Sequence, residues 1–191
     1  MLRPLSSTTD ISRRLEAALV ARNPRGMRFV HEVLQPAYLL RAAQQVIAAE
    51  GNVVICTGFP VAGTFETDGP PGAFALYHFL ESLGRKPWLL SGDVIIRALG
   101  ESIRTWPLKS FDYEGAHAEA QGLLLDLAPS LIIVIERPGA ATDGRFYNIA
   151  GKDITEQCRP VEPLLELATC PVIAIGDGGN EAGMGRAGKI L

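Results

Sequence analysis

Six carboxylates in three segments are the residues of this sequence best suited to chemistry. The segments span residues 57–72, 136–151 and 176–185, and each directly follows a predicted strand. The carboxylates are Glu66, Asp68, Glu136, Asp143, Asp177 and Glu181. The segments hold only two bases, Arg137 and Arg145, so six acids face two bases and the net charge is −4. If the segments converge, they would attract a divalent cation or an ammonium group. The alternative is that these aspartates and glycines only build turns.

Other catalytic groups are poorly supported by the sequence. There is no G-x-S-x-G nucleophile motif, and His31, His78 and His117 fall on predicted helices away from the three segments. Acid–base chemistry would therefore fall to carboxylates, with Tyr147 as an outside candidate. Because oxygen ligands dominate and no His or Cys residues cluster, Mg²⁺ or Mn²⁺ is favoured over zinc.

The three cysteines favour a reducing compartment. Cys56, Cys158 and Cys170 are odd in number and have no C-x-x-C spacing, so they predict neither a disulfide framework nor a zinc site. Each lies in or beside an apolar segment, which is typical of a buried free thiol.

Strands alternate with helices along the chain. Continuous apolar runs predict strands at residues 52–57, 87–91, 131–135 and 171–175, and helical periodicity predicts helices at 10–22, 37–50, 73–83 and 114–127. This pattern predicts an α/β fold, a three-layer sandwich with a mostly parallel sheet and helices on both faces, built as one domain over residues 1–191. In such a sheet the carboxyl ends of the strands line the ligand crevice, so the three segments should meet there.

Composition excludes several classes of protein. The 191 residues carry a net charge of −3, with 47% apolar and 20% charged residues, as in an ordinary globular domain. No apolar run is long enough to span a bilayer, and no Lys/Arg block points to nucleic acid. We therefore expect a small-molecule substrate and no membrane or nucleic-acid partner, in the cytoplasm or, if the source is eukaryotic, in the mitochondrial matrix. The oligomeric state stays open, a homo-oligomer included.

Two short strings match parts of known motifs. The G-x-G-x-x-G string at residues 183–188 neither follows a strand directly nor is followed by the acid that a dinucleotide site needs, so it is rejected. The string IAIGDGGNE at residues 173–181 resembles the last acidic motif of haloacid-dehalogenase-type phosphatases. Those enzymes also need an Asp-x-Asp motif, which this sequence lacks. Asp177 and Glu181 nevertheless remain candidates for binding a metal.

Taken together, the three segments resemble one family. TGFPVAGTFETDGPPGA, IERPGAATDGRFYN followed by GKDIT, and IGDGGNEAGMGR are similar to the C-terminal domain of D-glutamate cyclase, from about Gly26 to the end of the chain. The resemblance implies a lyase that closes D-glutamate to 5-oxo-D-proline with loss of water. The animal mitochondrial enzyme has a further N-terminal hydro-lyase-like domain that this sequence lacks. The family also continues beyond the third segment, which points to a chain truncated at its C-terminus.

The resemblance suggests roles for individual residues. The metal or acid–base roles go to Glu66, Asp68, Asp177 and Glu181, and Arg137 becomes the bidentate partner of the substrate α-carboxylate. The other expected substrate contacts are Thr57, Gly58, Asn148, Gly178, Gly179 and Asn180. Alternatively, Arg137 pairs with Glu136 or Asp143, and the glycines only permit a tight turn. Two other functions remain open: metal-dependent hydrolysis of phosphate esters, and binding of an amino acid or metal without catalysis.

Overall fold

The computed structural model describes residues 7–23, 25–99 and 102–184. They group into two compact units, one formed mainly by residues up to 48 and the other by residues 49–185. Each unit is described by itself. The prediction of a single domain over residues 1–191 stays a prediction, because compact units of this kind also occur within one domain.

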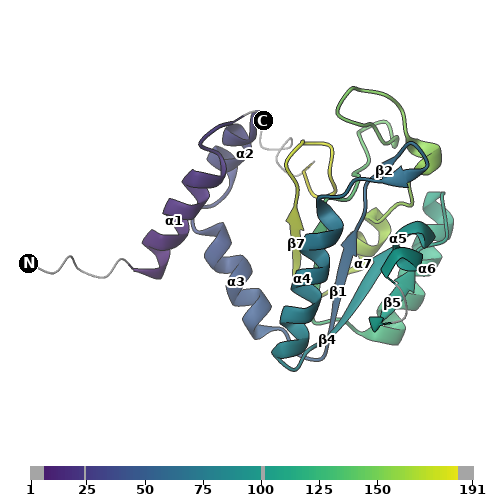
Figure 1. The fold of residues 1–191 in the computed structure, drawn as a ribbon, viewed down its shortest axis with the longest axis horizontal. Coiled ribbons are helices and arrows are strands. Elements are labelled where there is room, and N and C mark those ends of the chain that lie inside the picture. Colours follow the sequence, from purple (N-terminus) through teal and green to yellow (C-terminus); the bar gives the residue numbers. More distant parts are fainter. Residues whose placement is uncertain (1–6, 24, 100–101, 185–191) are drawn as a thin grey trace, which may run out of the picture. The chain divides into compact units, whose positions relative to one another are not determined.

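The larger unit is built on a five-stranded parallel sheet (Figure 1). In spatial order the strands are β5 (Thr105–Pro107), β4 (Lys86–Ser91), β1 (Asn52–Thr57), β6 (Leu131–Ile135) and β7 (Val172–Ile175). All four neighbouring pairs are parallel. The four predicted strands are confirmed to within one residue, whereas β5 was not predicted.

Helices cover both faces of the sheet, which confirms the predicted three-layer α/β fold. Helix α4 (Gly69–Ser82) packs on one face, where it contacts β1, β4 and β6. Helices α6 (Tyr113–Leu127) and α7 (Glu162–Leu167) pack on the other. Alternate strand residues such as Val54, Ile132 and Val134 join their core cluster, as the two-residue period of a strand requires. The short helices α5 (Asp93–Leu99) and η2 (Thr155–Gln157), like α7, were not predicted.

Helix α4 begins four residues earlier than its apolar pattern predicted. Asp68 caps it, accepting a hydrogen bond from the Gly69 amide at 3.0 Å, and two prolines occupy its first turn. Proline suits that turn because the amide it lacks would have no partner within the helix. The end of the first predicted loop is therefore helical, and the rest of it holds a short hairpin, β2 (Pro60–Val61) with β3 (Thr64–Phe65).

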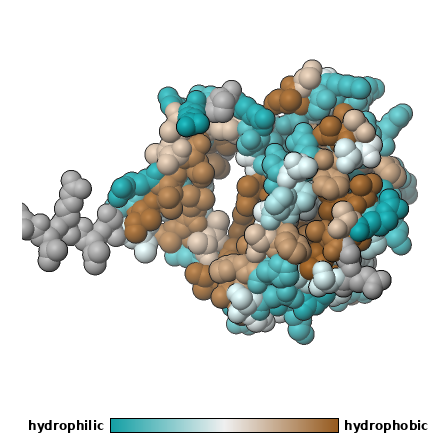
Figure 2. Space-filling view, viewed as in Figure 1, coloured by the Kyte–Doolittle hydropathy of each residue, from teal (hydrophilic) through white to brown (hydrophobic). Residues whose placement is uncertain are grey.

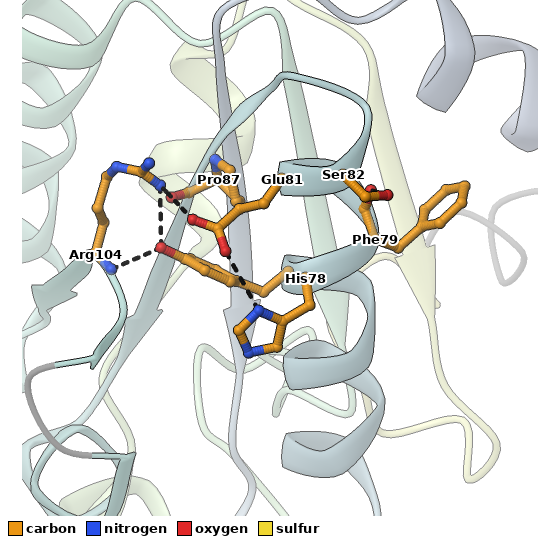
Figure 3. A network of polar contacts seen from close by, with 7 residues as sticks. His78, Phe79, Glu81, Ser82, Pro87 and Arg104 are labelled. Atoms are coloured by element: carbon orange, nitrogen blue, oxygen red, sulfur yellow. Dashed lines mark hydrogen bonds and ion pairs between the residues drawn. The ribbon is translucent and has the colours of Figure 1, made fainter.

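A polar network ties the other end of α4 to the amino ends of the strands (Figure 3). Arg104, just before β5, donates from Nη1 to Glu81 at 3.2 Å and to the Tyr77 hydroxyl at 3.0 Å. The Arg104 amide also donates to Tyr77, at 2.8 Å, and Glu81 further contacts His78 at 3.3 Å. These contacts fix α4 against the sheet at the end opposite the three predicted loops, and so hold the start of the helix in register with the carboxyl ends of the strands.

The smaller unit contains α1 (Thr8–Leu19), α2 (Met27–Val33) and α3 (Tyr38–Ala48). Helices α1 and α3 were predicted, and α2 was not. The Glu16 side chain is buried, and it accepts hydrogen bonds from the Ser12 hydroxyl at 2.6 Å and from the Ala37 and Leu39 amides at 3.0 Å each. A carboxylate of α1 thus satisfies the free amides at the start of α3. Burial alone would raise the pKa of Glu16, but these hydrogen bonds outweigh it and hold the pKa below its usual value.

An apolar stripe runs along α1. Ile11, Leu15 and Leu19 are spaced by four residues, and each has about half or more of its surface exposed. Figure 2 shows this apolar surface in brown on the smaller unit. Among the described residues, no helix has both the length and the apolar character needed to cross a membrane.

Candidate functional site

The three predicted loops meet at one edge of the sheet. They leave the carboxyl ends of β1, β6 and β7, which are adjacent and parallel. The chain leaves β1 toward β4 on one side and leaves β6 toward β7 on the other, so the order of connections reverses between β1 and β6. Ligand sites of open α/β sheets form at such reversals. We call this edge, where the loops converge as predicted, the carboxyl edge.

Three carboxylates come together there. Glu136, Asp177 and Glu181 each place one oxygen within 4.8 Å of the other two, and we call them the acidic triad. Glu136 follows β6 directly, whereas Asp177 and Glu181 belong to the loop after β7. Burial raises the pKa of Glu136 to about 7, and the negative charges of Glu181, Asp177, Asp68 and Glu66 add to the effect. The triad is thus a region of crowded negative charge that a cation would relieve.

The backbone of Glu136 is strained. Its φ angle is +46°, a left-handed conformation that costs a residue other than glycine roughly 1–2 kcal/mol. The start of α4 lies against this residue, since a Cβ added to Gly69 would stand 2.7 Å from the Cβ of Glu136 and 2.9 Å from Oγ1 of Thr57. Only glycine allows so close an approach. Strain of this kind is typical of functional sites.

The Thr57 side chain also lies against Gly69. It is fully buried, and its Oγ1 has no hydrogen-bond partner among the described residues. A buried hydroxyl without a partner is rare. Thr57 is thus a sequence-predicted substrate contact that lies beside Glu136 and Gly69 and whose side chain still has a hydrogen bond to make.

Glu181 is held by its own loop. Its carboxylate accepts hydrogen bonds from the amides of Asp177 at 3.2 Å, Gly178 at 2.7 Å and Gly179 at 2.7 Å. Gly178 and Gly179 were expected to contact the substrate, and in this structure their amides bind Glu181. The arrangement orients Glu181 within the triad, and direct contact of Gly178 or Gly179 with substrate stays a prediction.

The asparagines of the site connect or shape the loops. Asn180 donates from Nδ2 to the Tyr147 carbonyl at 2.9 Å, which joins the third loop to the second. Asn148 accepts from the amides of Ala150 and Lys152 at 3.1 and 3.0 Å and closes a turn. A substrate contact by either asparagine therefore also stays a prediction.

Asp143 and Tyr147 form a separate pair. The Tyr147 hydroxyl donates to Asp143 at 2.7 Å, and this bond raises the pKa of Tyr147 and lowers that of Asp143. Both side chains are thereby committed to the second loop. This geometry does not support Tyr147 as an acid or base, the less favoured role that the sequence suggested for it.

The buried Arg137 side chain links two backbone segments through hydrogen bonds. Only 5% of it is exposed, and its Nη1 and Nη2 donate to the carbonyls of Gly58 at 3.0 Å and Arg159 at 2.6 Å. Among the described residues it forms no ion pair with Glu136 or Asp143, so that alternative is not supported. Its Nε is buried without a partner. The proposed contact between Arg137 and a substrate carboxylate stays a prediction.

A pocket opens beside Arg137. Its volume is about 180 Å³, and Gly58, Ser91, Gly92, Ile95, Arg137 and Arg159 are among its lining residues. We call it the arginine pocket. It also includes Cys158, and burial raises the pKa of that thiol to about 12, so it is not a thiolate nucleophile near neutral pH.

Comparison with known proteins decides the family. The model of the D-glutamate cyclase-like, C-terminal family matches residues 15–191. The chain belongs to this family. The resemblance noted in the three loops is thereby confirmed. Among curated proteins, human "D-glutamate cyclase, mitochondrial" is 32% identical, and the match covers 87% of this chain but only 30% of the human protein. The chain therefore spans less than a third of that relative's length.

Two residues of this D-glutamate cyclase-like domain were not assigned roles from its sequence. Glu136 completes the triad, and its position directly after a buried strand was the signal that could have identified it. Arg159 lines the arginine pocket, and no local pattern marks it. Glu66 and Asp68, which were expected in the site, are exposed, and Asp68 caps α4. They act on Glu136 through charge and lie outside the group of three.

The acidic triad of this D-glutamate cyclase-like domain fits a hard divalent cation. It offers three carboxylate oxygens within 4.8 Å of one another, and carboxylate oxygens are the ligands that Mg²⁺ and Mn²⁺ prefer. The three hydrogen bonds to Glu181 leave one acceptor position, on Oε2, because a carboxylate has about four such positions and Oε1 already accepts two bonds.

Proposed function

We propose that this chain converts D-glutamate into 5-oxo-D-proline and water at the carboxyl edge. The observation that carries the proposal is the acidic triad at the reversal between β1 and β6, in a domain of the D-glutamate cyclase-like family. A triad of carboxylates suits this substrate because the reacting amine is an ammonium group near neutral pH. Negative charge would draw that group to the edge of the sheet.

The balance of the reaction states what the site must do. The α-nitrogen forms a bond to the γ-carboxyl carbon, and one γ-oxygen leaves. The ammonium group gives up two of its three protons, and the departing oxygen takes up two and leaves as water. The site must therefore accept protons near the nitrogen, deliver them near the γ-carboxyl group, and hold both ends of the substrate within bonding distance.

In our proposal the triad would hold a cation that polarises the substrate, and the residues around it would position the substrate. Glu136, Asp177 and Glu181 would hold Mg²⁺ or Mn²⁺, which when bound polarises the γ-carboxyl group as a Lewis acid. Asp177 is exposed and is the member of the triad best placed to meet solvent and an incoming ammonium group. Thr57 would donate its unpaired hydroxyl to a substrate oxygen. Glu66 and Asp68 would add negative charge at the rim.

The test measures product directly. Purified protein is incubated with D-glutamate or L-glutamate, with Mn²⁺, Mg²⁺ or chelator, and 5-oxoproline is followed by chromatography. The Asp177→Asn variant removes one triad charge, and Asp126→Asn removes an exposed charge from α6 as the matched control. We expect product from D-glutamate with wild type and Asp126→Asn, and at least a 100-fold lower rate with Asp177→Asn.

Two other outcomes would contradict the proposal. If D-glutamate raises the melting temperature but no product forms under any metal condition, the domain binds without catalysis. If the protein instead releases phosphate from generic phosphate esters in a metal-dependent way, the acidic loop serves hydrolysis.

A further inference from the structure

Arg159 makes one long ion pair with a half-exposed acid. Its side chain is 19% exposed, and its partner is Asp93, with 3.6 Å between Nη2 and Oδ2. That distance is beyond a good hydrogen bond. The Arg159 Nε atom is buried with no partner, and among the described residues the side chain makes no hydrogen bond. A guanidinium that is mostly removed from water normally pairs with a carboxylate or phosphate, so this group is short of a partner.

The Arg159 side chain is nevertheless held in place. Its guanidinium carbon lies 4.3 Å from the centre of the Phe111 ring, a cation–π contact. Its Nη1 also lies against the backbone of Gly92, since a Cβ added to that glycine would stand 2.8 Å from Nη1. The backbone carbonyl of Arg159 accepts the 2.6 Å hydrogen bond from Arg137. An ordered guanidinium loses little further entropy when it binds a ligand, which favours specific recognition.

The two charged residues that line the arginine pocket are both cations, whereas the acidic triad beside it is negative. These cations are Arg137 and Arg159. The acids around the pocket are Asp93, whose side chain is half-exposed, and Glu162 and Asp153, whose charges act on the lining residue Cys158. The two sites are neighbours because Arg137 directly follows Glu136 and contacts the Gly58 carbonyl at the end of β1. A small zwitterion therefore meets negative charge at one site and positive charge at the next.

We propose that Arg159 binds the α-carboxylate of the substrate in the arginine pocket, with Arg137 as the positioning residue behind it. This inference rests on the proposed function. The α-carboxylate keeps its charge throughout the cyclisation, whereas the γ-carboxyl group must lose an oxygen. An arginine that held the γ-carboxylate would stabilise the unreacted form and oppose the reaction. A pocket of about 180 Å³ is also smaller than the roughly 300–1,000 Å³ that hold drug-sized ligands, and suits part of an amino acid.

The inference makes a prediction about two substrates. D-glutamate and D-isoglutamine share the α-amine and the γ-carboxyl group, but D-isoglutamine carries a neutral carboxamide in place of the α-carboxylate. Arg159→Gln should raise KM for D-glutamate by about 10- to 100-fold, as expected for a lost hydrogen bond to a charged group. It should change KM for D-isoglutamine by less than about 2-fold. Because the contact is the same in ground and transition states, kcat should change little.

The control is Arg97→Gln, which removes an exposed positive charge from α5 in the same unit. It should leave the preference for D-glutamate over D-isoglutamine unchanged. Arg159→Lys keeps the charge but not the two-pronged geometry, and should give an intermediate preference. If circular dichroism shows that Arg159→Gln does not fold, the same measurements are made on Arg159→Lys instead. Equal effects on both substrates, or none, would overturn the proposal.

A binding measurement separates this inference from the proposed function. Calorimetric titration with D-glutamate and D-isoglutamine needs no turnover. Wild type could bind D-glutamate but make no product, and Arg159→Gln could lose at least 10-fold of that affinity while keeping its affinity for D-isoglutamine. That result would support the carboxylate subsite and refute the cyclase function. If the variant binds D-glutamate as wild type does, or if wild type binds neither compound, the subsite falls.

Discussion

Replacing Glu136 by glutamine is expected to stabilise the metal-free protein above pH 7. The folded protein holds the pKa of this carboxyl group at about 7, against 4.5 for an ordinary glutamate, mainly through burial and then through its acidic neighbours. The ionised form is therefore penalised by folding. Glutamine has nearly the same shape and no charge to bury, so it removes the penalty.

The magnitude follows from the size of the shift. A difference of about 2.5 pKa units corresponds to a ceiling of about 3.4 kcal/mol. Glu136 is only partly buried, so solvent screens part of this penalty, and about 1–2 kcal/mol is the realistic gain. For a chain of this size that gain corresponds to an increase of about 2–8 °C in melting temperature.

The difference in stability between wild type and Glu136→Gln depends on pH. Below pH 4.5 Glu136 is neutral in both the folded and the unfolded protein, so the two proteins should have equal stability there. Between pH 4.5 and 7 the unfolded protein ionises first, and wild type loses stability relative to the variant. Above pH 7 the difference should be constant.

Urea unfolding in the presence of chelator, from pH 4 to pH 8.5, measures this difference. Glu156→Gln, a change at an exposed glutamate of η2, is the matched control and should show no such dependence. Added Mn²⁺ should stabilise wild type and reverse the order at high pH, because the ion binds the carboxylate and not the amide. A difference that does not vary with pH, or a variant less stable than wild type at pH 8, would refute the electrostatic reasoning.

Three further predictions concern other positions. Glu16→Gln should destabilise the protein by about 1–3 kcal/mol at pH 7 in urea unfolding, because it weakens the acceptor for the buried Ser12 hydroxyl and two amides. Because the pKa of Glu16 is lowered, the stability that it contributes is present above its unfolded pKa and lost as pH falls through its folded pKa, so the variant and wild type should converge in acid. Gly58→Ala should lower the melting temperature by several degrees in calorimetry, because its φ angle is +109° and the new Cβ would stand 2.3 Å from Cδ1 of Ile95; an unchanged melting temperature would contradict this. Asp177→Ala should abolish 5-oxoproline formation and leave the melting temperature within a few degrees, whereas an unfolded variant would assign Asp177 a structural role.

Local pattern predicted the central elements of the fold. The strands at 52–57 and 131–135 were predicted to the residue because each is a nearly continuous apolar run, as expected of strands that helices cover on both faces of the sheet. Strand β5 has three residues of intermediate burial and lacks such a run, so no local signal marked it. The start of α4 was placed too late because its first turn is formed by glycine and proline, which weaken the helical pattern, and is fixed by the Asp68 cap.

The functional site, like the fold, was predicted from the sequence only in part. The sequence was sufficient to identify the three loops and their excess of acids, since loops of that length directly after strands are uncommon without a function. The position of Glu136 directly after a buried strand was a signal, but it did not decide that Glu136, rather than Glu66 or Asp68, would join Asp177 and Glu181. That choice depends on the left-handed backbone of Glu136 and on the close approach of Gly69, which is nearly 70 residues away along the chain.

By itself, the sequence determined the α/β class, the positions of the main strands and the acidic loops, because these follow from the hydrophobic period and the turn chemistry of neighbouring residues. Only the tertiary structure decided which side chains meet. It brought Glu136 into the acidic triad, used Arg137 to connect backbone carbonyls, and left Arg159 with only a long ion pair in the pocket. The physical reason is that these contacts depend on the order of strands in the sheet and on packing between segments distant in the chain, and no local pattern encodes either.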